Sequence, residues 1–161
     1  MFRLSRKGEY ALRTIFHLSV RNGMCTTEEI AKMQEIPQPF LKKIIQYLRV
    51  SGFISSSKGK KGGVTLSMPP ESISPWQVIA KIEGPLFLND CLICDGKCPR
   101  DEICSLHEMW EQCQSAIREI LEKQNFRDLV NRHMELVRKK HGEVIPEISP
   151  LSVLEAMHGK S

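Results

Sequence analysis

Four of the six cysteines lie close together in the second half of the chain: Cys91, Cys94, Cys98 and Cys104 fall within 14 residues. Thiolates are soft, charged donors that bind iron and zinc strongly, and a short loop with several of them can wrap a metal centre. The sequence has no apolar export signal and no apolar run long enough to span a membrane. We therefore expect a cytoplasmic protein whose reduced thiols serve metal or redox chemistry rather than a disulfide framework.

The spacing of these thiols allows three kinds of centre. An iron-sulfur cluster with two or four irons is one, because spacing does not fix the nuclearity. Zinc is the second, since Cys91-x2-Cys94 with Cys98 and Cys104 or His107 would close a tetrahedral site. Cluster-free redox thiols are the third. An enzyme with a small-molecule substrate is not indicated, because no βαβ pattern surrounds Cys91 and Cys94 as in thiol oxidoreductases.

The remaining cysteines and most histidines do not suggest a site. Cys113 lies in an apolar helical stripe and is expected in the core, and Cys25 is a lone thiol beside a helix cap. No ligand-spaced partner accompanies four of the histidines, which are His17, His133, His141 and His158. We therefore assign these groups no role.

The segment before the cysteine loop predicts three helices. Ser5 is expected to cap a helix over residues 6–21, and Thr26 with Glu29 three positions on predicts a capping box for a short second helix. Pro39 stands at the start of a third helix, where proline is tolerated. The apolar stripe of that helix consists of Leu41, Ile44, Ile45 and Leu48. This order of elements predicts a helix-turn-helix with the third helix as the recognition helix.

A β-hairpin is expected next, with strands over residues 53–57 and 64–67. The loop between them contains only glycine and lysine, which suits close approach to a phosphate backbone. The distribution of charge also favours binding to a phosphate backbone. Residues 1–70 carry 12 basic and four acidic side chains, whereas residues 71–161 carry 11 basic and 15 acidic side chains. The first part of the chain is therefore predicted to bind double-stranded DNA as a winged helix-turn-helix.

The expected DNA contacts come from three places. With its apolar stripe inward, the third helix presents Gln38, Lys42, Lys43, Gln46 and Arg49 outward, and Pro39 lies at its start. The wing contributes Lys58, Gly59, Lys60 and Lys61. Arg6 and Lys7 at the start of the first helix complete the predicted surface.

After a short helix that begins at Ser74-Pro75, a long amphipathic helix is expected from Cys104 to Lys123, and Asn125 is expected to cap a final helix. The long helix from Cys104 to Lys123 has a large apolar stripe along one side. A stripe of this size needs a partner surface, which a second copy of the chain supplies most simply. The predicted fold is thus mainly α with a small β-hairpin. Its parts are a winged head (1–83), a cysteine-rich loop (84–103), a dimerisation helix with the C-terminal helix (104–142) and a mobile tail (143–161).

Four stretches together resemble the family represented by the iron-sulfur cluster assembly regulator (IscR) and the nitric-oxide-sensing repressor (NsrR). They are Leu4-Ser5-Arg6-Lys7-Gly8-Glu9-Tyr10-Ala11-Leu12, Ile36-Pro37-Gln38-Pro39-Phe40-Leu41, Leu48-Arg49-Val50-Ser51-Gly52 and Gly59-Lys60-Lys61-Gly62-Gly63. The resemblance covers about residues 1–140. It implies a cytoplasmic homodimeric transcription regulator, such as a repressor, that binds a palindromic operator.

The resemblance also implies ligands for a cluster that senses iron-sulfur status, oxygen or redox state, or nitric oxide. Family members hold the cluster with three cysteines before the dimer helix. Cys98 and Cys104 match two of them, and Cys91 matches the third better than Cys94 does. For the remaining ligand, His107 matches the histidine of one branch, and Glu9 lies near the carboxylate that the other branch takes from the partner subunit.

Overall fold

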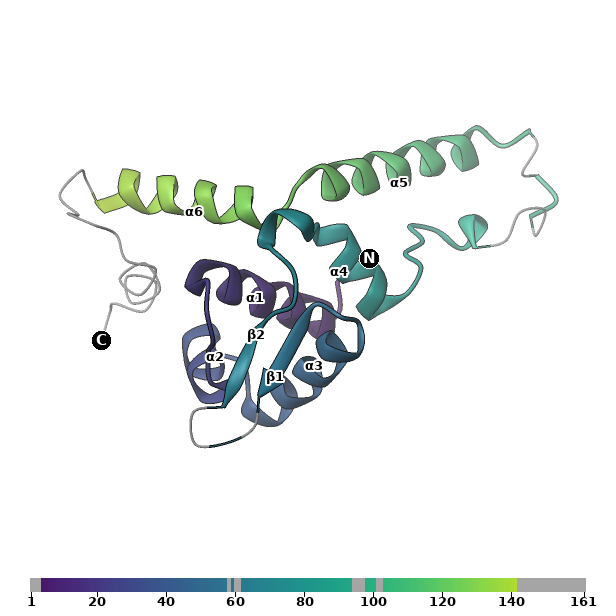
Figure 1. The fold of residues 1–161 in the computed structure, drawn as a ribbon. Coiled ribbons are helices and arrows are strands. Elements are labelled where there is room, and N and C mark those ends of the chain that lie inside the picture. Colours follow the sequence, from purple (N-terminus) through teal and green to yellow (C-terminus); the bar gives the residue numbers. More distant parts are fainter. Residues whose placement is uncertain (1–3, 58, 60–61, 94–97, 101–102, 142–161) are drawn as a thin grey trace.

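The computed structural model describes residues 4–57, 59, 62–93, 98–100 and 103–141. The predictions for Cys94, Lys58, Lys60, Lys61 and the tail over 143–161 lie outside these residues. Within the described part, a small head is built from four helices and a hairpin, and two further helices run in line across its top (Figure 1). The mainly helical fold with a small hairpin is confirmed.

The helices of the head begin where the sequence provides caps. Ser5 accepts from the Gly8 amide at the start of α1 (Arg6–Arg21), and Thr26 accepts from the Glu29 amide at the start of α2 (Thr27–Gln34). A full capping box between Ser74 and Gln77 begins α4 (Pro75–Glu83). The box expected at Thr26 forms only in part, because the Glu29 carboxylate lies 3.0 Å from Arg21 Nε instead.

The third helix, α3 (Gln38–Val50), begins after Pro37 and packs its apolar stripe inward. Leu41, Ile44 and Leu48 are fully buried against residues of α1, α2 and α4. Phe126 from the far end of the chain belongs to the same core. The helix-turn-helix is therefore held by one continuous apolar cluster.

The hairpin consists of β1 (Ile54–Ser57) and β2 (Gly63–Leu66), which pair antiparallel with Ile54 opposite Leu66. The Cys25 segment adds a short bridge to β2 at Val64. Gly63 is required at the edge of this bridge, because a Cβ there would lie 2.5 Å from the Cys25 carbonyl oxygen. The base of the wing is thus fixed to the loop between α1 and α2.

Beyond the wing, the short 3-10 turn η1 (Pro70–Ser72) leads into α4, and η2 (Asp90–Leu92) lies in the cysteine loop. The chain then forms α5 (Ser105–Lys123) and α6 (Phe126–His141). Asn125 Oδ1 accepts from the Asp128 amide, as expected of a cap for α6. No helix in the described ranges combines the length and the apolar character that crossing a membrane demands.

Candidate functional site

The outer face of α3 is fully presented to solvent. All six residues predicted to contact DNA from this helix are exposed, namely Gln38, Pro39, Lys42, Lys43, Gln46 and Arg49. Phe40 and Tyr47 are also exposed at 43% and 49%, and the sequence prediction did not include them. The helix therefore offers cationic, amide and aromatic groups along one accessible side.

The start of α1 contributes less free charge than the sequence prediction assumed. Lys7 Nζ donates to the Ile82 carbonyl oxygen at 2.9 Å and lies 3.9 Å from the centre of the Tyr47 ring. Arg6 forms an ion pair of 3.7 Å with Glu9. Lys7 thus ties α1 to α4 and α3, whereas Arg6 stays exposed at the start of α1.

In the wing, Gly59 has a φ of 118°, a conformation that favours glycine, and its carbonyl accepts from the Gly62 amide at 2.9 Å. This turn brings the two strands together. Gly59 is exposed, and the lysines on either side of it are outside the described residues.

The cysteine loop leads from α4 to the N-terminus of α5 (Figure 1). Cys91 lies in η2, Cys98 follows in the loop, and Cys104 is the N-cap residue of α5; all three are half-buried. His107 lies one turn into α5, with Nε2 3.5 Å from a Glu111 carboxylate oxygen. The Leu88 amide donates to Gln114 Oε1 at 3.1 Å and so fixes the start of the loop to α5.

The structure brings these donors into one loop but not into one tight group. Among the described residues, Cys91, Cys98 and Cys104 do not form a set of ligand atoms within 4.8 Å of one another. This is expected of metal ligands in a loop, because the ion itself gathers them. Glu9 lies on α1 and is paired with Arg6 at 3.7 Å and with Arg13 at 3.6 Å.

No residue of α5 is fully buried in the single chain, although the helix is strongly amphipathic. Trp110, Gln114, Ile117 and Leu121 are half-buried, whereas a neighbouring stripe is exposed. That stripe consists of Leu106, Met109, Cys113 and Ile120. The prediction that Cys113 lies in the core is therefore wrong, because no described element of the single chain covers this side of α5.

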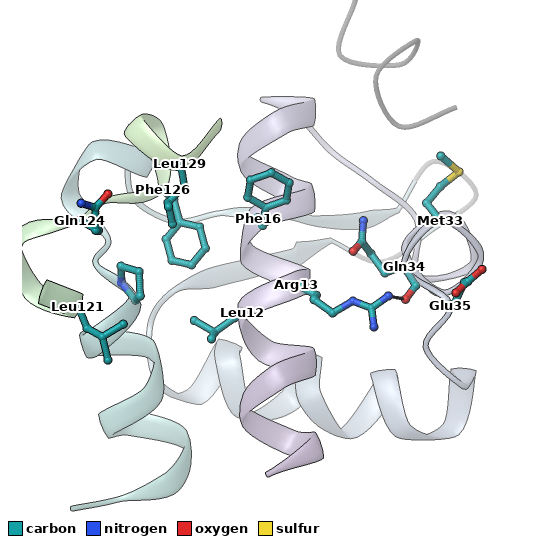
Figure 2. Close-up of a pocket in the computed structure, with 11 residues that line it drawn as sticks. Leu12, Arg13, Phe16, Met33, Gln34, Glu35, Leu121, Gln124, Phe126 and Leu129 are labelled. Atoms are coloured by element: carbon teal, nitrogen blue, oxygen red, sulfur yellow. Dashed lines mark hydrogen bonds between the residues drawn. The ribbon is translucent and has the colours of Figure 1, made fainter. Parts of the chain in front are cut away.

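A hollow of about 640 Å³ opens between α1, the end of α2 and the junction of α5 with α6 (Figure 2). Most of its lining is apolar and includes Leu12, Phe16, Met33, Leu121, Phe126 and Leu129. Arg13 crosses one side of it and donates to the Gln34 carbonyl oxygen. An apolar hollow of this size beside an uncovered apolar helix is a surface suited to another apolar element.

The interior of the head contains a titratable side chain, His17, which is fully buried in α1. Burial, with a smaller effect of the Arg21 charge, lowers the pKa of His17 to about 4. An unfolded chain takes up this proton below about pH 6.5, but the folded head does so only near pH 4. The neutral form of His17 therefore leaves the folded head at its full stability above pH 6.5. The head loses stability as the pH falls from 6.5 towards 4, because the unfolded chain binds the proton first.

We expect the free energy of unfolding to fall by about 3 kcal/mol over this pH range because of His17. Burial also lowers the pKa of His133, which acts in the same direction. Urea unfolding followed by circular dichroism at several pH values measures the change. The His17→Gln variant, which has no titrating group here, should show a clearly flatter pH dependence. An equally steep dependence in this variant would assign the effect to other groups.

The head and the helices beyond it match known proteins. The Rrf2 family, described as "Iron-dependent Transcriptional regulator", matches residues 4–132. An HTH-type transcriptional regulator of Aquifex aeolicus is 33% identical over 135 residues, which cover 82% of this chain and 90% of that protein.

Two solved structures share the architecture. CymR of B. subtilis, the global cysteine regulator, has a TM-score of 0.70 and 25% identity, covering 82% of this chain and 98% of its own. T. potens IscR has a TM-score of 0.65 at 22% identity, covering 91% of this chain and 94% of its own, and so supports the fold. With the winged helix-turn-helix described above, these matches show that the chain belongs to the Rrf2 family of DNA-binding transcriptional regulators and is not an enzyme.

Proposed function

We propose that this regulator acts as a homodimer on a palindromic operator, and that an iron-sulfur cluster in the cysteine loop controls its affinity for DNA. The observation that carries the DNA part is the exposed outer face of α3, where Lys42, Lys43 and Arg49 stand opposite the buried side of the helix, which is formed by Leu41, Ile44 and Leu48. Such a helix enters the major groove with its polar side chains towards the base edges. A regulator that binds DNA in this way acts in the cytoplasm, where the DNA lies.

The dimer is supported by the uncovered stripe of α5. Leu106, Met109 and Ile120 are 62%, 41% and 63% exposed in the single chain. Exposed apolar side chains aligned along a helix mark an interaction surface. A second copy offers the same stripe and the same hollow, so a two-fold arrangement would cover both. Two recognition helices would then face half-sites about 34–36 Å apart.

The donor set of the loop fits an iron-sulfur cluster. Cys91, Cys98 and Cys104 are half-buried free cysteines within or at the end of one loop, and thiolates are the ordinary ligands of such clusters. His107 lies three residues after Cys104 on α5, where side chains at i and i+3 are neighbours. Glu9 is engaged by two arginines of its own chain. Because His107 follows Cys104 in the same chain segment, we favour it over Glu9 as the fourth ligand, with Cys94 as the alternative within the loop.

The placement of Cys104 suggests how the loop would affect DNA binding. Its carbonyl oxygen accepts from the amides of His107 and Glu108 at 3.0 and 3.3 Å, so it forms the first turn of α5. A restraint on this residue restrains the start of the proposed dimer helix. When bound, the cluster would supply this restraint through its sulfur ligands, and its lability to oxygen or nitric oxide would supply the signal. Release of the loop would then alter the spacing of the two heads.

The DNA surface predicts two different effects of lysine removal. Lys43→Ala should weaken operator binding by about 1–3 kcal/mol if the lysine contacts a base edge. Lys60→Ala in the wing should weaken operator and unrelated duplexes about equally and reduce the slope of log affinity against log salt by about 1. Fluorescence anisotropy with labelled duplexes at several salt concentrations measures both effects.

The matched control for these variants is Lys139→Ala, which removes an exposed lysine of α6. It lowers the net charge by the same amount, so it should leave the operator affinity within about two-fold of the parent because it lies outside the proposed surface. Unchanged binding by both Lys43→Ala and Lys60→Ala would refute this DNA interface.

A further inference from the structure

A second group of potential metal ligands lies inside the head, apart from the cysteine loop. His17 of α1, Cys25 of the following loop and Glu29 of α2 offer ligand atoms that all lie within 4.8 Å of one another. His17 and Cys25 are buried at 0% and 1% exposure, and Glu29 is half-buried. Among the described residues, this is the group of three histidine, cysteine or acidic side chains whose ligand atoms lie within that distance of one another.

The imidazole of His17 is positioned as a ligand would be. Its Nδ1 lies 3.3 Å from the Gln34 side-chain amide, whereas Nε2 is buried and has no hydrogen-bond partner in the described structure. A buried polar atom without a partner is costly, and a bound ion would remove this cost. Rotation of the Gln34 side-chain amide by about 180° exchanges its oxygen and nitrogen, and the oxygen then accepts a hydrogen bond from Nδ1–H of His17. Metal-binding histidines are commonly oriented by a hydrogen bond of this kind.

Charge at the cluster is compatible with a divalent ion. His17 is fully buried, and the neutral imidazole is the form that binds metals. Arg21 Nε lies 3.0 Å from Glu29 Oε1, and a carboxylate has two oxygens, so it can pair with a guanidinium and bind an ion together. The carboxylate and a Cys25 thiolate together supply two negative charges. These charges would balance the ion, and Arg21, which also lies beside Cys25, would remain paired with Glu29.

We propose that His17, Cys25 and Glu29 form a metal site for a divalent cation that accepts nitrogen, sulfur and oxygen ligands, with Zn²⁺ as its representative. The ion would bond to the sulfur as the thiol proton leaves to water, and a water molecule would complete a tetrahedral shell.

The site would fix the base of the wing. The Cys25 amide donates to the Val64 carbonyl at 2.9 Å, and the Val64 amide donates back at 2.8 Å. An ion bound to Cys25 would therefore join α1, α2 and β2 at one point. The expected consequence is a more stable head, because a ligand that binds only the folded state stabilises it.

The test uses a full-length variant in which Cys91, Cys94, Cys98 and Cys104 are all serine, which removes the loop as a competing site. This loop-cysteine variant should bind one Zn²⁺ per chain in competition with a chromogenic chelator. Its melting temperature should rise with zinc by at least about 4 °C. With Co²⁺, it should show a thiolate-to-cobalt absorption band.

Two substitutions and one matched control then locate the ion. In the loop-cysteine variant, Cys25→Ser should abolish the cobalt band, and Glu29→Gln should weaken zinc binding at least about ten-fold. Glu28→Gln, at the adjacent exposed position, should change neither measurement. Circular dichroism confirms that each variant is folded.

The partly exposed position of Glu29 makes Glu29→Gln the decisive variant if Cys25→Ser fails to fold. Absence of zinc binding by the folded loop-cysteine variant would overturn the proposal. So would equal zinc affinity in the Glu29→Gln and Glu28→Gln variants. Because the loop cysteines are absent throughout, none of these results depends on whether the loop holds an iron-sulfur cluster.

Discussion

Replacement of Cys98 or Cys104 by alanine should abolish the visible absorbance and the bound iron of anaerobically purified protein. Each variant removes one of three thiolates that would hold the cluster, and two thiolates with one weaker ligand cannot retain it. Cys104 also begins α5. Absorbance spectra with iron and sulfide analysis measure the loss.

The control for these variants is Cys113→Ala, because Cys113 is an exposed thiol of α5 beyond the loop. It should retain the full absorbance of the parent. Retention of a complete cluster by either Cys98→Ala or Cys104→Ala would contradict the ligand assignment. A colourless parent that holds zinc, and loses one zinc per chain when Cys98 or Cys104 is replaced, would instead identify the loop as a zinc site.

Two charges placed on the exposed stripe of α5 should convert the dimer to monomers and weaken operator binding at least about 100-fold. Met109→Glu with Ile120→Glu is the appropriate pair, since both side chains are exposed in the single chain and lie on the same side of the helix. In the dimer these carboxylates would be buried without partners, which is strongly unfavourable. Light scattering gives the mass, and anisotropy gives the affinity.

The matched control is Ser115→Glu, an exposed position on the opposite side of α5. This substitution adds a carboxylate without touching the stripe, so mass and operator affinity should stay close to those of the parent. A double variant that remains dimeric would show that the stripe is not the interface. The dimer would then have to form through another surface.

The elements of the head could be predicted because their signals are local. Ser5, Thr26 and Ser74 cap helices at the positions that the sequence indicated, and the apolar stripe of α3 is buried as its spacing required. The hairpin follows from two short strands, each with one buried apolar residue, around a glycine-rich turn. Such signals act within a few residues, so one sequence is enough to detect them.

Contacts between distant segments could not be predicted in the same way. Lys7 was expected on the DNA surface, yet its amine donates to a carbonyl 75 residues further along the chain. Glu29 was expected to complete a capping box, but tertiary packing places it beside Arg21. His17 has no ligand-spaced partner in the sequence, because Cys25 and Glu29 approach it only through the packing of α1 on α2. Each outcome depends on how elements pack, and sequence spacing alone does not determine that.

The proposal of cluster-controlled DNA binding is tested most directly by one comparison of operator affinity. Anaerobically purified protein with its iron and sulfide quantified is measured on a palindromic duplex, and the same preparation is measured again after oxygen or nitric oxide has removed the cluster. Salt concentration is held constant, because affinity for DNA depends steeply on it. We expect the two affinities to differ at least about ten-fold, which corresponds to a coupling free energy of about 1.4 kcal/mol. Equal affinities before and after cluster removal would contradict the proposal.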